Sequence, residues 1–195
     1  LVRSATGRMG ILATENSFHG KTMGALSATN RESYQKAFGA PIPGFFKVPF
    51  GDLEALRLML ANHSEQIAAF FVEPIQGEGG IVEPPSGYLK SAKALCEEFG
   101  VLLVADEIQT GLGRTGRLFA CEAEGITPDV LILAKALGGG LVPVGAMLCT
   151  EAVYTEEFAT KHSSTFAGNT LACRVGLKSL DLLLRDDAAL IKHVE

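Results

Sequence analysis

Short apolar runs alternate with amphipathic stretches along most of the chain. Five runs, at residues 10–14, 67–72, 101–105, 130–134 and 144–149, have the length and the continuous apolar character of strands buried on both faces. We expect none of them to be an exposed antiparallel edge strand. Runs of this kind separated by helical patterns are typical of a mostly parallel sheet flanked by helices, so the pattern predicts an α/β fold.

Two helices are indicated between these runs. The clearest begins with Ser86 as its predicted N-cap, places apolar residues at three- and four-residue spacing as far as Phe99, and ends at Gly100. Asp52 is the predicted cap of the second helix, over residues 53–60. Both helices would cover a face of the sheet.

The remaining segments complete one domain. A helical pattern returns at Asn169 and continues through Leu184, whereas residues 39–51, which contain three prolines, predict an irregular excursion. No repeat, low-complexity tract or linker divides the sequence. One domain is therefore the simplest partition.

The composition agrees with a globular chain. The 195 residues are 47% hydrophobic and 20% charged, as in proteins that fold in water. A net charge of −5 without a basic cluster argues against nucleic acid or an anionic membrane as partner, and no apolar run reaches the roughly 18 residues of a membrane helix. A small molecule is the expected partner. The start at Leu1, with neither an initiator Met nor a signal peptide, suggests a piece of a longer chain.

Metal chemistry is not indicated. The four cysteines, Cys96, Cys121, Cys149 and Cys173, stand far apart without a C-x-x-C spacing, and the four histidines are equally scattered. We expect the cysteines to be small buried thiols in a reducing compartment, which predicts a cytoplasmic protein.

Two glycine-containing motifs are weaker than they look. Residues 19–22 resemble the end of a phosphate-binding P-loop, but Glu15 occupies the position of its first glycine and Phe18 fills the loop. Residues 111–116 form a literal G-x-G-x-x-G, but four residues separate it from the preceding strand, whereas a dinucleotide-binding loop follows its strand immediately. A structural or flexible glycine loop is the better interpretation, and an NAD-dependent dehydrogenase is the remote alternative.

A carboxylate and an amine follow two neighbouring apolar runs. Asp106 follows the run at 101–105, and Lys135 follows the run at 130–134 about 30 positions later, which is the length of one βαβ unit. Ligands of open parallel sheets gather at the carboxyl ends of strands, so both side chains could face one cavity. Residues 138–140, all glycine, leave space for a flat ligand or another backbone.

This pair suits one cofactor chemistry. A lysine amine can form a Schiff base with the aldehyde of pyridoxal phosphate, whose ring then accepts electrons from the bound substrate. The ring does so only while its pyridine nitrogen stays protonated, which a neighbouring carboxylate such as Asp106 ensures. For this pair alone, the alternative is that Asp106 and Lys135 simply end their strands at the solvent edge.

Five motifs that follow one another in order point to a family. They are NSFHGKT at residues 16–22, VEPIQGEGG at 72–80, ADEIQTG at 105–111, AKALGGG at 134–140 and STFAGN at 164–169. With these motifs the chain resembles the class III aminotransferases, the pyridoxal-phosphate family that includes ornithine, acetylornithine, 4-aminobutyrate and putrescine aminotransferases. The resemblance covers essentially every residue and implies the fold of the aspartate aminotransferase type, called fold type I.

The resemblance also implies which part of such an enzyme the chain represents. Residues 1–195 would form the central part of the large cofactor-binding domain. An upstream glycine-containing phosphate loop and the small domain, which is assembled from both ends of a complete enzyme, would lie outside this sequence. We therefore expect the chain to be inactive on its own.

The matching motifs carry residue roles with them. By resemblance, Lys135 is the Schiff-base lysine and moves the proton between the substrate carbon and the cofactor carbon. Asp106 holds the pyridinium nitrogen of the cofactor, and Gln109 forms a hydrogen bond with the phenolic oxygen of the ring. A silent scaffold, which keeps these motifs for packing only, is the alternative of another class.

Further residues would surround the same ring. The resemblance implies that Phe18 stacks on its face, that His19 lies at the cofactor, and that Glu73 lies beside the ring on its substrate side. Read without the family, Phe18 is an ordinary core residue and Glu73 an acid in an N-terminal turn.

The resemblance also predicts a homodimer with shared sites. Thr165 is similar to the family threonine that binds the cofactor phosphate of the neighbouring subunit, and Ser164 lies next to it near the substrate. Read by itself, Thr165 is a hydroxyl at a helix start. Glu78 matches a glutamate that gates the substrate site in the ornithine-type enzymes.

The expected reaction transfers a terminal amino group from an ω-amine or diamine to a 2-oxo acid such as 2-oxoglutarate, in amino acid or polyamine metabolism. Lys21 stands where ornithine and acetylornithine enzymes carry an arginine, and lysine lacks the two-donor fork that grips a carboxylate. Residues 18–29 look most like the putrescine enzymes. Alternatives are acetylornithine or 4-aminobutyrate transaminases, and the family's aminomutases and decarboxylases. Thr170 departs from the proline usual at its position.

Overall fold

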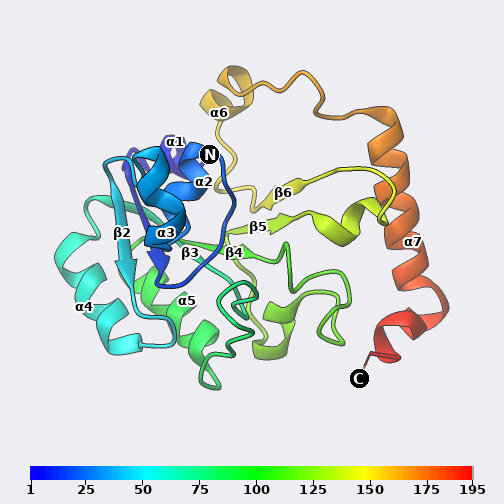
Figure 1. Cartoon of the computed structure of the whole chain (residues 1–195), viewed down its shortest axis with the longest axis horizontal. Coiled ribbons are helices and arrows are strands. Elements are labelled where there is room, and N and C mark those ends of the chain that lie inside the picture. Colours follow the sequence, from blue (N-terminus) through cyan, green and yellow to red (C-terminus); the bar gives the residue numbers. More distant parts are fainter. Residues whose placement is uncertain (195) are drawn as a thin grey trace.

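The computed structural model describes residues 1–194 and is built around a six-stranded sheet with the order β2-β1-β3-β4-β5-β6 (Figure 1). The strands are β1 (Gly10–Thr14), β2 (Phe45–Val48), β3 (Ile67–Val72), β4 (Leu102–Asp106), β5 (Val130–Leu133) and β6 (Ala146–Cys149). The pairings from β2 to β5 are parallel, and β6 joins β5 antiparallel at one edge. The predicted α/β fold with a mostly parallel sheet is confirmed.

Helices connect and cover the strands. They are α1 (Val2–Thr6), α2 (Met23–Ala28), α3 (Glu32–Gln35), α4 (Leu53–His63), α5 (Tyr88–Glu98), α6 (Glu156–Lys161) and α7 (Thr170–Lys192), with 3-10 turns η1 (Lys36–Phe38), η2 (Ala120–Glu124) and η3 (Lys135–Gly138). In Figure 1, α4 and α5 lie together beside the sheet, and α7 stands at the far end of the molecule, beyond β5 and β6.

Alternating strand residues build a separate core on each face of the sheet. Phe70 and Leu103 belong to the cluster that packs under α4 and α5, whereas their neighbours Ala69 and Val104 pack with Val2 of α1 on the opposite face. Both faces of the central strands are therefore covered. This explains why these strands read as continuous apolar runs rather than as an alternation of apolar and polar residues.

Most predicted elements appear at their predicted positions. The runs at 10–14 and 67–72 are β1 and β3, and the other three predicted strands differ from the observed ones by no more than two residues at either end. Asp52 caps α4 through a hydrogen bond from Ala55 N to Oδ1 (2.9 Å). α4 extends three residues beyond its predicted end. α7 leaves the helical conformation at Arg185–Ala188 before a last helical turn, so the predicted end of its first part at Leu184 is confirmed.

The irregular excursion predicted for residues 39–51 was wrong in part. Phe45–Val48 form β2, which pairs parallel with β1 at the edge of the sheet. The prolines stand outside the four paired residues, with Pro43 before and Pro49 after them. Because proline cannot donate to a ladder, it limits a strand here rather than forbidding one.

The expectation that no run forms an antiparallel edge strand was also wrong. β6 pairs antiparallel with β5, and Met147 and Leu148 on it are partly exposed. The connection from β5 to β6 contains only the single turn η3, whereas a parallel return usually crosses the sheet through a full helix. The crossover between β4 and β5 is likewise made of loops and η2 rather than an α-helix.

The predicted N-cap of α5 was wrong by one residue. The cap is Gly87 in a left-handed conformation, and Ser86 makes no capping hydrogen bond. A distant carboxylate takes its place, since Glu124 accepts hydrogen bonds from Gly87 N (3.1 Å) and Lys90 N (2.7 Å). A carboxylate at this position satisfies amides that the helix leaves free and interacts favourably with the helix dipole.

No helix within residues 1–194 combines the length and the apolar character that crossing a bilayer requires.

The distant cap of α5 gives a stability prediction. Replacing Glu124 with Ala should lower the free energy of unfolding of the protein by about 1 kcal/mol, because two amides at the start of α5 lose their acceptor. Urea denaturation followed by circular dichroism measures the change. Glu151→Ala, which alters an exposed acid in a turn, is the matched control, and an equal loss in both variants would show that Glu124 does not cap the helix.

Candidate functional site

The side chains of Asp106 and Lys135 meet in one cavity of about 170 Å³. Parallel pairing places the carboxyl-terminal ends of β4 and β5 side by side, with Asp106 opposite Ile132. Lys135 follows β5 after one further residue. The cavity is lined by Phe18, His19, Gly20, Glu73, Glu78, Asp106, Ile108, Gln109 and Lys135. Seven of the predicted site residues therefore line this one cavity.

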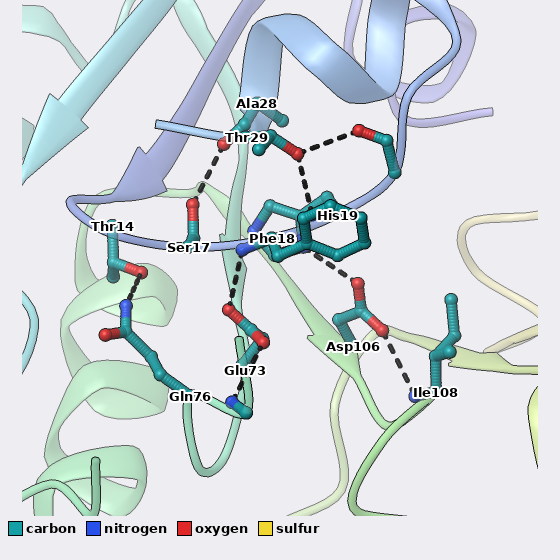
Figure 2. A network of polar contacts seen from close by, with 12 residues as sticks. Thr14, Ser17, Phe18, His19, Ala28, Thr29, Glu73, Gln76, Asp106 and Ile108 are labelled. Atoms are coloured by element: carbon teal, nitrogen blue, oxygen red, sulfur yellow. Dashed lines mark hydrogen bonds and ion pairs between the residues drawn. The ribbon is translucent and has the colours of Figure 1, made fainter. Parts of the chain in front are cut away.

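Asp106 is held in one orientation by two donors (Figure 2). The His19 ring nitrogen Nδ1 lies 2.8 Å from Oδ2, with both side chains only 4% exposed, and Ile108 N donates to Oδ1 at 3.1 Å. The contact with a carboxylate calls for the ring proton on Nδ1. His19 is therefore a buried hydrogen-bond partner of the Asp106 carboxylate. Its own backbone amide donates to Thr29 Oγ1 (2.8 Å), which fixes the loop that carries it.

Lys135 occupies a backbone conformation that is unusual for its residue type. It begins η3 with a φ of 41°, in the region that favours glycine, so its position is set by the surrounding structure. Its amine donates a hydrogen bond to Gln109 Oε1. The glycines after it serve a second element, because a Cβ on Gly139 would lie 2.9 Å from Ser179 Oγ of α7. A helix, rather than a flat ligand, approaches that stretch.

Gln109 lies between Lys135 and the loop after β3. A Cβ added to Gly77 would come within 2.9 Å of Gln109 Cγ, so only glycine leaves the amide side chain its present place. The VEPIQGEGG motif thereby takes part in the site through a residue without a side chain.

Glu73 is buried at the same cavity. Its oxygens accept hydrogen bonds from Phe18 N (3.0 Å) and Gly77 N (3.4 Å), as Figure 2 shows in part. Burial raises the pKa of the Glu73 carboxyl above its ordinary value, and the nearby charge of Asp106 adds to this, while the Phe18 hydrogen bond opposes it. Glu73 ties the loop that bears Phe18 to the end of β3. Phe18 lines the cavity and meets the Tyr34 ring edge-on at 6.4 Å.

Glu78 sits on a small closed loop. Gln76 and Val82 exchange two backbone hydrogen bonds, and the buried side chain of Gln76 donates to Thr14 Oγ1 (3.1 Å) and Glu15 O (2.7 Å) at the end of β1. The loop between residues 76 and 82 is therefore anchored at its base. Glu78 on this loop reaches the cavity wall.

Three predicted residues lie apart from this cavity. Lys21 is exposed, and its amine stands 5.0 Å from the centre of the Tyr34 ring. Thr165 and Ser164 belong to the segment 161–170, every residue of which is exposed. Ser164 lines a different hollow, formed with residues 142–145 and the start of α7. The chain by itself does not bring these three residues to Lys135.

Sequence reasoning missed several contributors. Gly77 and Ile108 carry no chemistry of their own and act through space and a backbone amide, so no residue type announces them. Glu107 was not among the predicted site residues, although a second carboxylate directly after Asp106 at the end of a buried strand was a usable signal.

The glycine loop at 111–116 is packed rather than open. A Cβ on Gly111 would lie 2.7 Å from Glu107 O, and one on Gly113 would lie 3.2 Å from Ile191 of the last helix. These glycines allow close approach within the protein, which gives no support to a dinucleotide site. Within residues 1–194, no three His, Cys, Asp or Glu side chains gather as a metal site would require.

Comparison with solved structures gives close likenesses. An ornithine aminotransferase from Toxoplasma gondii is 41% identical with a TM-score of 0.86, over 95% of this chain and 42% of that one, and pyridoxal phosphate partly occupies its active site. An acetylornithine aminotransferase from Elizabethkingia anophelis is 38% identical with a TM-score of 0.74, over 94% of this chain and 41% of that one.

A third likeness is an (S)-enantioselective ω-transaminase from Thermomicrobium roseum. It is 36% identical with a TM-score of 0.83, over 94% of this chain and 46% of that one. This chain thus spans less than half the length of each of these structures. The family model of the class-III aminotransferases matches residues 1–195. The chain therefore belongs to the class III aminotransferases, a family of pyridoxal-phosphate enzymes.

Proposed function

We propose that this chain carries the Schiff-base lysine and the pyridinium partner of a pyridoxal-phosphate aminotransferase that moves a terminal amino group to a 2-oxo acid. The observation that carries the proposal is the cavity shared by the Lys135 amine and the Asp106 carboxylate. An amine on one side and a held carboxylate on the other are the two groups that this cofactor requires of its protein.

The residues present fit the cofactor ring. The cavity offers the Phe18 ring, the Gln109 amide and the Asp106 carboxylate around one lysine. At about 170 Å³ it is smaller than the roughly 300–1,000 Å³ of typical small-molecule pockets, and Lys135 is the one cation among its lining residues. The ring-binding part is therefore present, and we propose that the phosphate is held largely by groups outside this cavity.

The proposed mechanism assigns each residue one task. Bound pyridoxal phosphate supplies an aldehyde for covalent capture of amines and a ring that stabilises negative charge on the substrate carbon. Asp106 would keep the ring nitrogen protonated, and the hydrogen bonds of His19 and Ile108 fix the orientation of its carboxylate. Once exchange with the donor amine has freed it from the cofactor, Lys135 Nζ would take the proton from the substrate carbon and return it to the cofactor carbon.

Neighbouring side chains orient these groups. Phe18 and Gln109 line the cavity, and Gln109 contacts Lys135, so Phe18 would stack on the ring and Gln109 would form a hydrogen bond with its phenolic oxygen. Glu73, buried beside the ring, keeps the Phe18 loop in place. Burial raises the pKa of the Glu73 carboxyl above its ordinary value.

For the amino donor we propose a diamine or ω-amine of the putrescine or ornithine type. The likeness to an ornithine aminotransferase and an ω-transaminase supports a terminal amine, and Glu78 at the cavity wall supplies a carboxylate that can attract a second cationic amine. The exposed Lys21 lies outside the cavity and offers no two-donor clamp for a carboxylate. Acetylornithine and 4-aminobutyrate are the competing donors.

We also propose a homodimer whose two active sites are shared. α7 exposes a series of leucines, Leu171, Leu177, Leu182, Leu184 and Leu190, of which Leu171 is 65% exposed. Buried against a second copy, this apolar surface would stabilise the assembly. The exposed Thr165, which precedes α7, would then reach the cofactor phosphate of the partner's site.

The setting of the chain follows from the same reasoning. We propose that residues 1–195 form the central part of the large domain of such an enzyme, and that the protein is cytoplasmic. All four cysteines are free thiols, but the prediction that they are buried was wrong for Cys173, which is exposed on α7. Burial raises the pKa of Cys96 and of Cys121 to about 12, which leaves both poor partners for disulfide formation.

The lysine assignment predicts a spectroscopic loss. In the natural full-length protein, added pyridoxal phosphate should produce a visible absorbance band, and Lys135→Ala should abolish it because no amine remains for covalent capture. Borohydride reduction followed by peptide mass spectrometry should place the cofactor on Lys135 of the wild type. Lys90→Ala, on the outer helix α5, should keep the band. A band that persists in Lys135→Ala would remove the assignment.

The donor proposal predicts an order of activities. With 2-oxoglutarate as acceptor, glutamate formation should be fastest with putrescine or ornithine and slower with acetylornithine and 4-aminobutyrate, because only the first two carry a second cationic amine that Glu78 can attract. A panel of the four donors at equal concentration measures kcat/KM for each. Preference for 4-aminobutyrate would overturn the donor class, and no turnover of any amine would overturn the transaminase proposal.

The shared-site proposal predicts complementation between two inactive variants. Lys135→Ala and Thr165→Ala homodimers should both lose most activity, whereas a dimer made from one chain of each should contain one intact site, if Lys135 and Thr165 of each site come from different chains. Refolding an equimolar mixture should therefore restore roughly a quarter of the wild-type activity, because about half of the dimers are mixed and each has one site. No recovery despite mixed dimers would contradict shared sites.

A further inference from the structure

Glu107 is a buried acid to which the proposed mechanism gives no task. It directly follows Asp106, is 1% exposed, and continues the sheet through a hydrogen bond from its backbone amide to Ile132 O (3.0 Å). Ionised carboxylates are costly to bury unless charges or hydrogen bonds compensate them. Within residues 1–194, no Lys, Arg or His forms an ion pair with it.

Hydrogen bonds from one loop compensate the Glu107 carboxylate. It accepts from the hydroxyl of Thr110, from Ala120 N (3.1 Å) and from Cys121 N (2.8 Å). Gly111 N donates to the Glu107 backbone oxygen (2.8 Å). One side chain therefore closes the loop of residues 107–121 by binding both its beginning and its end.

Gln109 is enclosed by these hydrogen bonds. On one side, Ile108 N donates to Asp106 Oδ1, and on the other, the Thr110 hydroxyl donates to Glu107. Two adjacent acids thus hold the two neighbours of Gln109. The backbone at Gln109 has little freedom to move as long as both acids are in place.

The side chain of Gln109 is confined in the same way. Gly77 stands against its Cγ, and its amide oxygen accepts from the Lys135 amine. Gly77 prevents the Gln109 side chain from moving to that side. A small shift of the Gln109 backbone would therefore change the distance between the Gln109 amide oxygen and the Lys135 amine.

We propose that Glu107 is a positioning residue that sets Gln109 against the reactive amine of Lys135. It touches neither the cavity nor the amine and acts only through the loop that it closes. The inference deepens the proposed function and rests on it for the spectroscopic readout, while the geometry of Glu107, Gln109 and Lys135 stands without a cofactor.

A double-mutant cycle tests the proposal. In the natural full-length protein loaded with pyridoxal phosphate, the pH midpoint of the visible band is measured in Glu107→Gln, Gln109→Ala and the double variant. Both single variants should move the midpoint in the same direction by about one to two units, as expected for one lost hydrogen bond to a charged group. The double variant should move it no further than Gln109→Ala alone. Additive shifts, or an unchanged midpoint in Glu107→Gln, would overturn the proposal.

Two further variants keep the test decisive. Thr110→Val removes one of the three hydrogen bonds with little change of shape and should produce the same shift in smaller measure, even if Glu107→Gln does not fold. Glu122→Gln makes the same chemical change at an exposed acid of the neighbouring turn and should leave the midpoint unchanged. If Glu122→Gln moved the pH midpoint as far as Glu107→Gln does, or if Thr110→Val left it unchanged, a specific role of Glu107 would be refuted.

A readout without cofactor separates this inference from the proposed function. The rate of acetylation of Lys135 in the apoprotein, measured by mass spectrometry against Lys90 in the same sample, should change in Gln109→Ala and equally in Glu107→Gln. If the wild type forms no visible band, the proposed function fails, and these rates alone decide whether Glu107 acts on Lys135. Equal rates in wild type and Glu107→Gln, with a changed rate in Gln109→Ala, would refute the positioning role.

Discussion

The parallel pairing of β4 with β5 is the constraint on which the site depends. It aligns Asp106 with Ile132, so β4 and β5 have their carboxyl-terminal ends side by side, and the residues that follow line one cavity. Had β5 run in the opposite direction, Lys135 would lie near the amino-terminal end of β4, a strand length away from Asp106. The chemistry of the amine and the acid therefore follows from a backbone ladder that contains no polar side chain until its last residue.

The two acids at the end of β4 show how neighbouring carboxylates acquire different tasks. Side chains alternate along a strand, so Asp106 and Glu107 leave the backbone in opposite directions. Asp106 meets a histidine and a single backbone amide at a cavity that it helps to line, and its oxygens stay available to a ligand. Glu107 meets a hydroxyl and two amides and is fully occupied by them. The surroundings, and not the residue type, separate a site residue from a supporting one.

Periodicity, capping residues and the order of the strands in the sequence predicted a large part of the fold. The buried strands, the Asp52 cap and the meeting of Asp106 with Lys135 follow from periodicity and strand order. What the sequence did not reveal depends on distant partners: β2 needs β1 beside it, α5 takes its cap from Glu124, and Gly77 matters only because Gln109 packs on it. The roles proposed for Thr165 and Ser164 rest on the family resemblance alone, since nothing within residues 1–194 brings them to Lys135.

The last helix links the proposed dimer surface to the reactive lysine. α7 packs on η3, where Gly176 contacts Leu137 and Ser179 approaches Gly139, yet only Gly176 and Ile191 of its residues are buried. Helices in proteins draw most of their stability from a packed face rather than from intrinsic propensity. Leu180 and Leu183 of α7 pack on the core, whereas five other leucines of α7 stay exposed within residues 1–194. A second copy that covers them would also press α7 against η3. Because η3 begins at Lys135 in a conformation that its own residue type disfavours, the proposed assembly would also affect the position of the Lys135 amine.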